Sequence, residues 1–535
     1  MGKPFYYDYF SLGQTAPEVW HKDFFWPVSR ATTTQITEDF KKFHCDLINR
    51  LGNTFEGDCL AIAYHISGKF TEVVNHYVCL QRLESGGYSI APSKMLSLIP
   101  LLQKKTGDIE FKHNYLSVPA CSQHTHFRNA LNSFKFNFIN GRYCCQKQVI
   151  PGSATIASAG VLTHEYARNL DNWIKIISPG YLLEENYSGS SNASPETLEI
   201  FNAVTDEFTR FAAAYTIGNF GIELPENIRK GLASFTIAYL QKVSRVYSSL
   251  QKGVSSKKIK SFLSSTAGSP YNRALGLAVI RNGGEVTGFP HGYFICHHSG
   301  SRPGFHEFST VTRFTAYTER SIPLFKRNIE ANPLPRGHSI SLVSDNTMFF
   351  KDLHESWMGK SRPDKIKTVM ILELSMIPEW AGYYSAEAMV NYHFYYSLCS
   401  ALSRNGYKVI FKRRPKDLSW EGYNLFRDIP NVEIIYEHFE KPGVIDQCDA
   451  VIAQYGCSST LNWSMCTNKT VIYVDAGWET WFPDVYGLMS KRCRILHCSY
   501  DERNRAVFDE KELLSILEPE QEDPDPGYVV NYLYP

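Results

Sequence analysis

The segment after a short apolar run in the last third of the chain carries residues that could bind an anion. The run Ala450–Ala453 is followed by Gly456 and then by Ser458, Ser459 and Thr460. Glycine permits a tight turn, and hydroxyl groups at a helix start bind phosphate together with the free N–H groups of the first turn. We interpret this segment as a phosphate-binding loop. The alternative is that a serine here only caps the helix.

Cations follow a second apolar run, Lys408–Phe411, and a proline then stiffens the chain. They are Lys412, Arg413 and Arg414, with Pro415 after them. Three positive side chains at the end of a strand suit a phosphate or a carboxylate, although a solvated surface cluster is the alternative. We predict that Lys412 and Arg414 contact the phosphate of a ligand.

Polar residues also follow the other apolar runs of this region. They are Glu373, Glu437, His438 and Asp475. Carboxylates and an imidazole at strand ends could read the base or the ribose of a nucleotide, and we predict this role for all four. Each of them could equally be an ordinary turn or surface residue.

The earlier part of the chain offers candidates for acid–base chemistry. His291-Gly292 follows the predicted strand Glu285–Phe289, and an imidazole at a strand end is well placed for base catalysis or phosphate contact. Glu165 is the candidate catalytic carboxylate, although a structural role is the more common alternative. Asn272 and Arg273, before the helix Leu275–Asn282, and Gly292 are predicted on the phosphate side of the site.

The elements that must position these residues alternate between strands and helices. Short apolar runs at 367–374, 408–411, 432–436, 450–453 and 470–474 predict strands buried on both faces. Helices are predicted between them, including 383–405, closed by Gly406, and 460–466. This alternation is typical of an α/β fold with a doubly wound parallel sheet, which binds ligands beyond the carboxyl ends of its strands.

The remaining parts of the chain differ in the secondary structure that their sequence patterns predict. We predict a strand at Cys59–His65, a helix at Phe70–Gln81, and a helical insertion at about 155–265 that includes Pro195–Ala214 and Ile228–Leu250. The domains expected are an acceptor-side α/β half at 1–335, a nucleotide-binding Rossmann-like half at 336–515, and an acidic, Pro-rich tail at 516–535, of which 518–527 is expected to be irregular. The linker between the halves is expected at Ile329–Pro335 or at Met358–Lys365.

Composition excludes some classes of protein. With 55 Lys and Arg against 54 Asp and Glu among 535 residues, the formal charge is +1, which argues against a general nucleic-acid binder. The 13 cysteines are scattered without a C-x-x-C pair, as in a reduced cytosolic protein. No signal-peptide pattern begins the sequence, and no apolar run nears the ~20 residues that span a bilayer. We expect a cytoplasmic protein, with peripheral contact at the inner face of the cytoplasmic membrane left open.

These motifs, in this order, resemble the GT-B glycosyltransferases. The likeness is carried by His291-Gly292, by Lys412-Arg413-Arg414-Pro415 and by the segment from Asp449 to Ser458-Ser459, and it covers roughly residues 265–480. More narrowly, they resemble bacterial capsule and lipopolysaccharide transferases, including Kdo transferases, and are similar to the CDP-glycerol glycerophosphotransferases. The sequence departs from that pattern at Arg414, where the family has a histidine, so a proton-shuttling role there is not implied.

The resemblance implies two Rossmann-like domains facing across a cleft and transfer of a sugar from a nucleotide donor to a glycan or lipid-linked glycan. An ulosonic acid such as Kdo, carried by CMP, would suit the cationic strand end. The implied reaction needs no metal and no cofactor, and the D-x-D pattern occurs only in the acidic tail. Two other interpretations stay open: a nucleotide-sugar 2-epimerase-like enzyme, and a non-catalytic polysaccharide-binding component of an envelope assembly.

Overall fold

The computed structural model of the protein describes most of the chain. The described residues are 3–8, 11–12, 15, 17–91, 98–104, 107–111, 147–151, 174–176, 193–256, 258–264, 269–290, 297–300, 307–332, 334–344, 346, 348–373, 388–413, 426–439, 441, 443–454, 456, 458–477, 479–518 and 524–535. The predicted site residues Glu165, His291, Gly292 and Arg414 lie outside these ranges.

The first half of the chain builds a parallel six-stranded sheet of order β4-β3-β5-β6-β7-β8. Its strands are β3 (Lys147–Pro151), β4 (Ile174–Ile176), β5 (Ser261–Ser264), β6 (Glu285–Gly288), β7 (Arg313–Ala316) and β8 (Ser341–Ser344). The helix α11 (Pro270–Arg281) packs on β5 and β6. Further elements near the sheet are α12 (Ile322–Ala331), η3 (Glu319–Ser321) and η4 (Pro335–Gly337).

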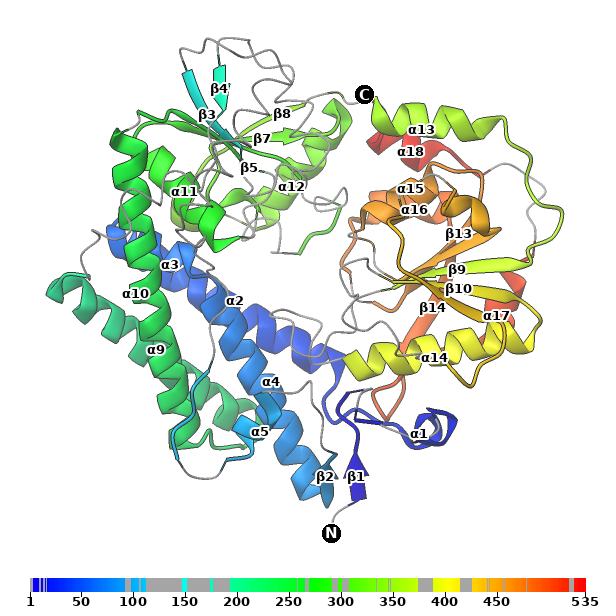
Figure 1. Ribbon diagram of the computed structural model, residues 1–535, viewed down its shortest axis with the longest axis horizontal. Coiled ribbons are helices and arrows are strands. Elements are labelled where there is room, and N and C mark those ends of the chain that lie inside the picture. The colour runs from blue at the N-terminus through cyan, green and yellow to red at the C-terminus, as the bar shows by residue number, and fades with distance from the viewer. Residues whose placement is uncertain are drawn as a thin grey trace, which may run out of the picture.

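Helices, several of them long, extend this half away from its sheet (Figure 1). They are α2 (Arg30–Leu51), α3 (Phe55–Ile62), α4 (His65–Ser85), α5 (Leu98–Leu102), α9 (Pro195–Phe220) and α10 (Glu226–Ser256). The two predicted helices in 195–250 are confirmed. In α9, the Ser194 hydroxyl accepts a hydrogen bond from the N–H of Thr197, Pro195 occupies the first turn, and Gly221 closes the helix at a φ of 65°.

The strand predicted at Cys59–His65 is wrong, because these residues belong to α3 and to the start of α4. Residues Cys59–Ala63 are at most 1% exposed, since α3 packs against α2, α10 and α11. A helix buried on all sides is apolar at every position, and so is a buried strand, so a short run cannot distinguish the two. Thr54, whose hydroxyl accepts from the N–H of Gly57, is the capping signal that marks the helix.

The second half contains a seven-stranded sheet of order β11-β10-β9-β12-β13-β14-β15, parallel except for its last pair. Its strands are β9 (Thr368–Leu372), β10 (Lys408–Lys412), β11 (Val432–Ile435), β12 (Ala450–Ala453), β13 (Thr470–Asp475), β14 (Arg494–Tyr500) and β15 (Ala506–Phe508). Its helices are α13 (Phe349–Met358), α14 (Ala388–Arg404), η7 (Ile445–Gln447), α15 (Ser459–Met465), α16 (Pro483–Arg492) and α17 (Glu510–Ser515). All five strands predicted in this region are confirmed, and Gly406 follows α14 with a φ of 82°.

The chain passes between the halves later than residue 335. β8 still pairs with β7, whereas α13 already contacts the second half, where Phe349 packs on Trp463 with ring centroids 5.3 Å apart. Of the two linkers that we predicted, Met358–Lys365 begins at the last residue of α13 and ends before β9. Figure 1 shows the two sheets in separate lobes, with α13 beside the second.

The last part of the predicted tail, from the end of the stretch 518–527 that we expect to be irregular, forms a helix. Residues Gly527–Tyr532 form the helix α18, which packs on α16, and Tyr528 and Val529 are fully buried. The acidic, Pro-rich stretch is followed by a few apolar residues at helical spacing. Burial of these side chains stabilises the helix.

The start of the chain also belongs to both halves. β1 (Lys3–Phe5) pairs with β2 (Tyr88–Ile90), next to α4, while α1 (Pro17–Asp23) packs on α14. The fold class predicted from the sequence, two Rossmann-like α/β domains with a partly helical first half, is confirmed. Within the described ranges, none of the helices has both the length and the apolar character needed to cross a bilayer.

Candidate functional site

The carboxyl edge of the second sheet collects polar residues in one row. Lys412, Leu372 and Ala453, the last residues of β10, β9 and β12, are cross-strand partners. The residues that come next, Arg413, Glu373 and Gln454, therefore stand side by side at this edge. The chain runs outward from β9 through β10 to β11, and in the other direction from β12 through β13 to β14. Glu373 and Gln454 thus flank the topological switch point, where ligands bind in open α/β sheets.

Glu373 and Arg413 form a buried ion pair at this edge. Arg413 Nε lies 3.2 Å from Glu373 Oε2, its Nη2 lies 3.2 Å from Oε1, and both side chains are 0% exposed. Lys412 is also buried, and its Nζ donates to the carbonyl oxygen of Arg413 at 2.7 Å. An ammonium group has three donors and no acceptor, so Lys412 places a positive charge at this edge.

The sequence pattern predicts a base or ribose contact for Glu373 but does not indicate its partner, and it predicts the phosphate contact for Lys412 and Arg414. The middle cation of the run, Arg413, is the one that ties β10 to β9. The signal that could have found this pair is the equal offset of both residues from the ends of neighbouring strands, since such residues meet across a parallel sheet.

The predicted phosphate loop begins as expected, with α15 starting at Ser459. The Ser458 hydroxyl accepts from the N–H of Thr460 at 3.2 Å and is also hydrogen bonded to the Thr460 hydroxyl. Ser458 therefore caps the helix, as the alternative interpretation proposed. The Ser459 and Thr460 hydroxyls lie at the same helix start, and their contact with a phosphate stays a prediction.

Gly456 is required for a close approach of another segment. Its N–H donates to Glu479 Oε2 at 2.7 Å. A Cβ at this position would lie 2.4 Å from the ring of Trp481 and 2.5 Å from the Glu479 carboxylate. Any other residue would therefore displace the segment that covers the loop.

This covering segment, residues 479–481, was not found from the sequence. Besides the Gly456 N–H, Glu479 Oε2 accepts the hydroxyl proton of Tyr473 at 2.6 Å, and Trp481 Nε1 donates to the Tyr473 oxygen at 3.2 Å. Burial, with the neighbouring Glu479 carboxylate, raises the pKa of Tyr473 well above its usual value, so the hydroxyl stays protonated. Tyr473 lies in β13, so the cover is anchored to the sheet beside the switch point.

The same segment links the two halves of the protein. The N–H of Ser299 donates to the carbonyl oxygen of Thr480 at 2.8 Å, and the N–H of Phe482 donates to that of His297 at 3.0 Å. His297 is itself buried and hydrogen bonded through Nδ1 to the Tyr528 hydroxyl of α18 at 2.7 Å. Burial lowers the pKa of His297 well below its usual value, so its ring is neutral at pH 7.

The other predicted contacts of the base and ribose lie farther along the edge. Glu437 and His438 are exposed beyond the end of β11, the outermost strand. Two strand spacings, about 10 Å, separate that strand from β9. Asp475 ends β13, where its Oδ1 accepts from the N–H of Gly477 at 3.0 Å and its Oδ2 from the Tyr486 hydroxyl at 2.6 Å. A role for these three residues in binding a ligand stays a prediction.

Asn272 and Arg273 lie in the first half, in the first turn of α11, and both are buried. Arg273 is fully buried, and it donates from Nε to the carbonyl oxygen of Ala61 at 2.8 Å and from Nη2 to the Ser309 hydroxyl at 2.9 Å. Burial lowers its pKa to about 10, which leaves it charged at pH 7. These contacts give Arg273 a role in packing and do not support the phosphate contact predicted for it.

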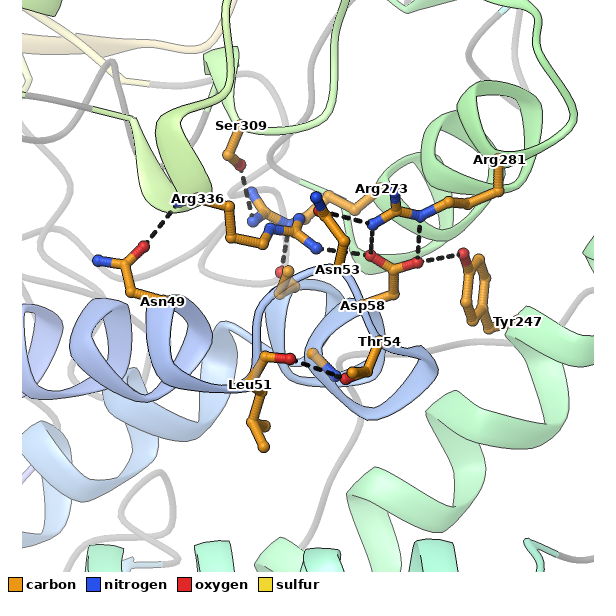
Figure 2. Close-up of polar contacts among 12 residues, drawn as sticks. Asn49, Leu51, Asn53, Thr54, Asp58, Tyr247, Arg273, Arg281, Ser309 and Arg336 are labelled. Atoms are coloured by element: carbon orange, nitrogen blue, oxygen red, sulfur yellow. Dashed lines mark hydrogen bonds and ion pairs between the residues drawn. The ribbon is translucent and has the colours of Figure 1, made fainter.

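A second buried carboxylate lies beside Arg273 (Figure 2). Asp58 accepts from Arg281, from Arg336 at 2.6 Å and from the Tyr247 hydroxyl at 2.7 Å. These partners come from α11, η4 and α10, so Asp58 joins α3 to three surrounding elements. The arginines lower the pKa of Asp58, which keeps it ionised. We interpret this cluster as structural, because every oxygen of the carboxylate is used internally.

Among known proteins, the chain is similar to some solved structures in fold only. No family model matches the sequence, and no curated protein matches it. Among solved structures, it is similar to S. aureus MnaA in complex with UDP, with 12% identity over 72% of this chain and 94% of that one and a TM-score of 0.35. It is similar to UDP-N-acetylglucosamine 2-epimerase from Rickettsia bellii, with 10% identity over 73% and 94% and a TM-score of 0.38.

A third similar structure is spinosyn rhamnosyltransferase SpnG complexed with spinosyn aglycone, at 11% identity over 72% of this chain and 94% of that one, with a TM-score of 0.28. At such TM-scores the function must be argued from the residues of the site.

Proposed function

We propose that the protein is a nucleotide-sugar-dependent glycosyltransferase whose donor binds at the carboxyl edge of the second sheet. The observation that carries the proposal is the row Arg413, Glu373 and Gln454 at the switch point, with Lys412 beside it. Burial of polar and cationic groups carries a desolvation cost. At the edge where open α/β sheets bind ligands, contacts with a charged ligand offset that cost.

In this proposal the donor phosphates lie between Lys412 and the hydroxyls of Ser459 and Thr460. As the glycosidic bond to the phosphate breaks, negative charge grows on the leaving oxygen. Fixed positive and hydroxyl donors stabilise that charge more in the transition state than in the ground state. No metal is required for this step. An acid–base residue from the first half, His291 or Glu165, would take the proton from the acceptor hydroxyl.

The large first half supports transfer over isomerisation. Its helices α2, α4, α9 and α10 add mass that an enzyme acting on one small substrate does not need, and a bulky glycan or lipid-linked glycan acceptor would use it. Within this class, an ulosonic acid carried by CMP would place its carboxylate near Lys412, because the sugar itself is an anion, whereas the charge of Arg413 is already paired with Glu373.

A ligand panel tests the proposal. We expect millimolar CMP, UDP, GDP or CDP to raise the melting temperature, since a ligand that binds only the folded state stabilises it. Lys412→Ala should reduce that rise, and Lys408→Ala, an exposed lysine at the other end of the same strand, should not. Failure of every nucleotide to stabilise the protein would reject the proposal.

Turnover then separates the two enzyme classes. A transferase should release free nucleotide from its donor when an acceptor glycan is added, and this release should persist in EDTA. Isomerisation of the sugar without nucleotide release would instead establish the epimerase-like alternative.

A further inference from the structure

Gln454 is a buried amide without a hydrogen-bond partner. It is 2% exposed, and across the described part of the chain neither Nε2 nor Oε1 of its side chain has a partner. Folded proteins pair almost all of their buried polar side-chain atoms, because an unpaired group loses its bonds to water and gains nothing in return. An amide that leaves both atoms unpaired therefore needs an explanation.

The position of Gln454 in the fold explains why its amide is unpaired. It is the first residue after β12, directly beside Glu373 across the switch point. Two residues later comes Gly456, and the segment then enters α15, where Asn462 is also fully buried with both amide atoms unpaired among the described residues. Two unpartnered amides on one strand–loop–helix segment, at the edge where ligands bind, indicate a polar interior that a ligand completes.

The chemistry of the amide narrows the ligand group. A phosphate oxygen only accepts hydrogen bonds, so it would use Nε2 and leave Oε1 unpaired. A hydroxyl group both donates and accepts, so hydroxyls of a sugar ring can satisfy both atoms of the amide.

We propose that Gln454 is a ligand-binding specificity residue whose amide holds hydroxyl groups of the sugar part of the donor. These hydroxyls belong either to the ribose of the nucleotide or to the sugar that it carries. The inference rests on the proposed function, because it assumes that the donor binds at this edge.

The test replaces Gln454 with methionine, which has a similar length and no amide. In the absence of ligand, Gln454→Met should melt at the same temperature as the wild type or higher, because it removes an unpaired polar group. Binding of the best nucleotide of the UDP, CDP, GDP and CMP panel, or of its nucleotide sugar, should weaken roughly tenfold or more, the size expected for one or two lost hydrogen bonds.

Two analogues distinguish the source of the hydroxyls. If they are on the ribose, the wild type should prefer the nucleotide to its 2′-deoxy form, and Gln454→Met should lose that preference. If they are on the transferred sugar, the wild type should prefer the nucleotide sugar to the bare nucleotide, and Gln454→Met should lose that preference instead.

Thr205→Val is the matched control. The Thr205 hydroxyl in α9 is buried and also has no partner among the described residues, but it lies in the first half, away from this sheet. The control should change the ligand-free melting temperature little and leave nucleotide binding unchanged.

The possible failures are distinguishable. If no nucleotide binds the wild type, the proposed function fails, and the inference fails with it. If nucleotides and nucleotide sugars bind the wild type and Gln454→Met equally well, only the inference is overturned. A large fall in the ligand-free melting temperature of Gln454→Met, or failure of both Gln454→Met and Gln454→Leu to fold, would also overturn it, since the amide would then be satisfied within the protein.

Discussion

At the scale of single residues, Glu479 joins two parts of the candidate site through its carboxylate. One oxygen of its carboxylate accepts from both the Gly456 N–H and the Tyr473 hydroxyl. Glu479→Ala leaves two donors without an acceptor and should lower the free energy of unfolding by about 1–3 kcal/mol for each donor that stays buried. Glu479→Gln keeps an acceptor in the same place, so its loss should be smaller. Urea denaturation measures both.

Glu433→Gln, in β11, is the control that removes a carboxylate charge elsewhere in the second half. Glu433 is half exposed and pairs with Lys408 at 2.9 Å at the surface, so this change should cost no more than about 1 kcal/mol. Equal stability of Glu479→Ala and the wild type would show that the 479–481 segment does not depend on this carboxylate to cover the loop.

At the scale of elements, the Glu373–Arg413 pair ties the ends of β9 and β10 together. Removing one partner leaves a buried charge without compensation, so Glu373→Gln or Arg413→Met should each cost about 3–5 kcal/mol. The double change Glu373→Leu with Arg413→Met should cost much less than the sum, because neither charge of the pair is left without its partner. A double-mutant cycle from urea unfolding measures this coupling energy.

The exposed pair Lys408–Glu433 joins β10 to β11 in the same sheet and is the matched control, with an expected coupling of about 0–1 kcal/mol. If the two cycles gave the same coupling energy, burial would not be what makes the Glu373–Arg413 pair strong.

The elements of the second half could be predicted because their apolar runs are short, β-branched and separated by polar helices. The runs at Ala450–Ala453 and Lys408–Phe411 match β12 and β10 almost residue for residue. The buried helix at Cys59–Ile62 could not be told from a strand, since periodicity vanishes when all faces are covered.

The same limit applies to the site. Strand ends locate Glu373 and Asp475, because the edge of the sheet follows from local pattern alone. Glu479 and Trp481 contact Gly456 from a later loop. Glu479 lies 23 residues after Gly456 in the chain. Such a contact depends on how the loop folds back, and residue type does not reveal it.

At the scale of the whole molecule, two contact regions among the described residues join the halves. One is the 479–481 segment with His297 and α18. The other is the start of the chain, where Trp20 stacks on Tyr392 of α14 at 5.3 Å and Asn504 Nδ2 donates to the carbonyl oxygen of Trp26 at 2.7 Å. Since residues 30–85 continue from this start into the helices of the first half, the N-terminal segment acts as a strap across both halves.

A pair of stacked histidines, His21 in the strap and His393 in α14, should make the contribution of the strap to stability depend on pH. The rings of His21 and His393 lie 4.0 Å apart, and the His21 Nε2 is hydrogen bonded to the Ser397 hydroxyl at 2.7 Å. Burial lowers the pKa of His21 to about 4 and that of His393 to about 3. The charged groups that act on the pair are Arg404, Arg505, Asp428 and Asp501.

The unfolded chain takes up protons on both histidines as pH falls below about 6.5, whereas the folded protein stays neutral there until about pH 4. Their contribution is therefore present above pH 6.5 and is lost as pH falls below it, toward about pH 4 for His21 and about pH 3 for His393. The double variant His21→Phe with His393→Phe should flatten the fall of unfolding free energy in that window by up to about 1.4 kcal/mol per pH unit for each histidine.

Urea unfolding at pH values from 7.5 to 4.5 measures the slope, and His438→Gln, which changes an exposed histidine beyond β11, should leave it unchanged. The other buried histidines, among them His44 and His76, will keep some pH dependence in the double variant. A slope identical to that of the wild type would mean that the strap is already released at the start of the titration, so that the two halves depend on the 479–481 segment and α18 to stay together.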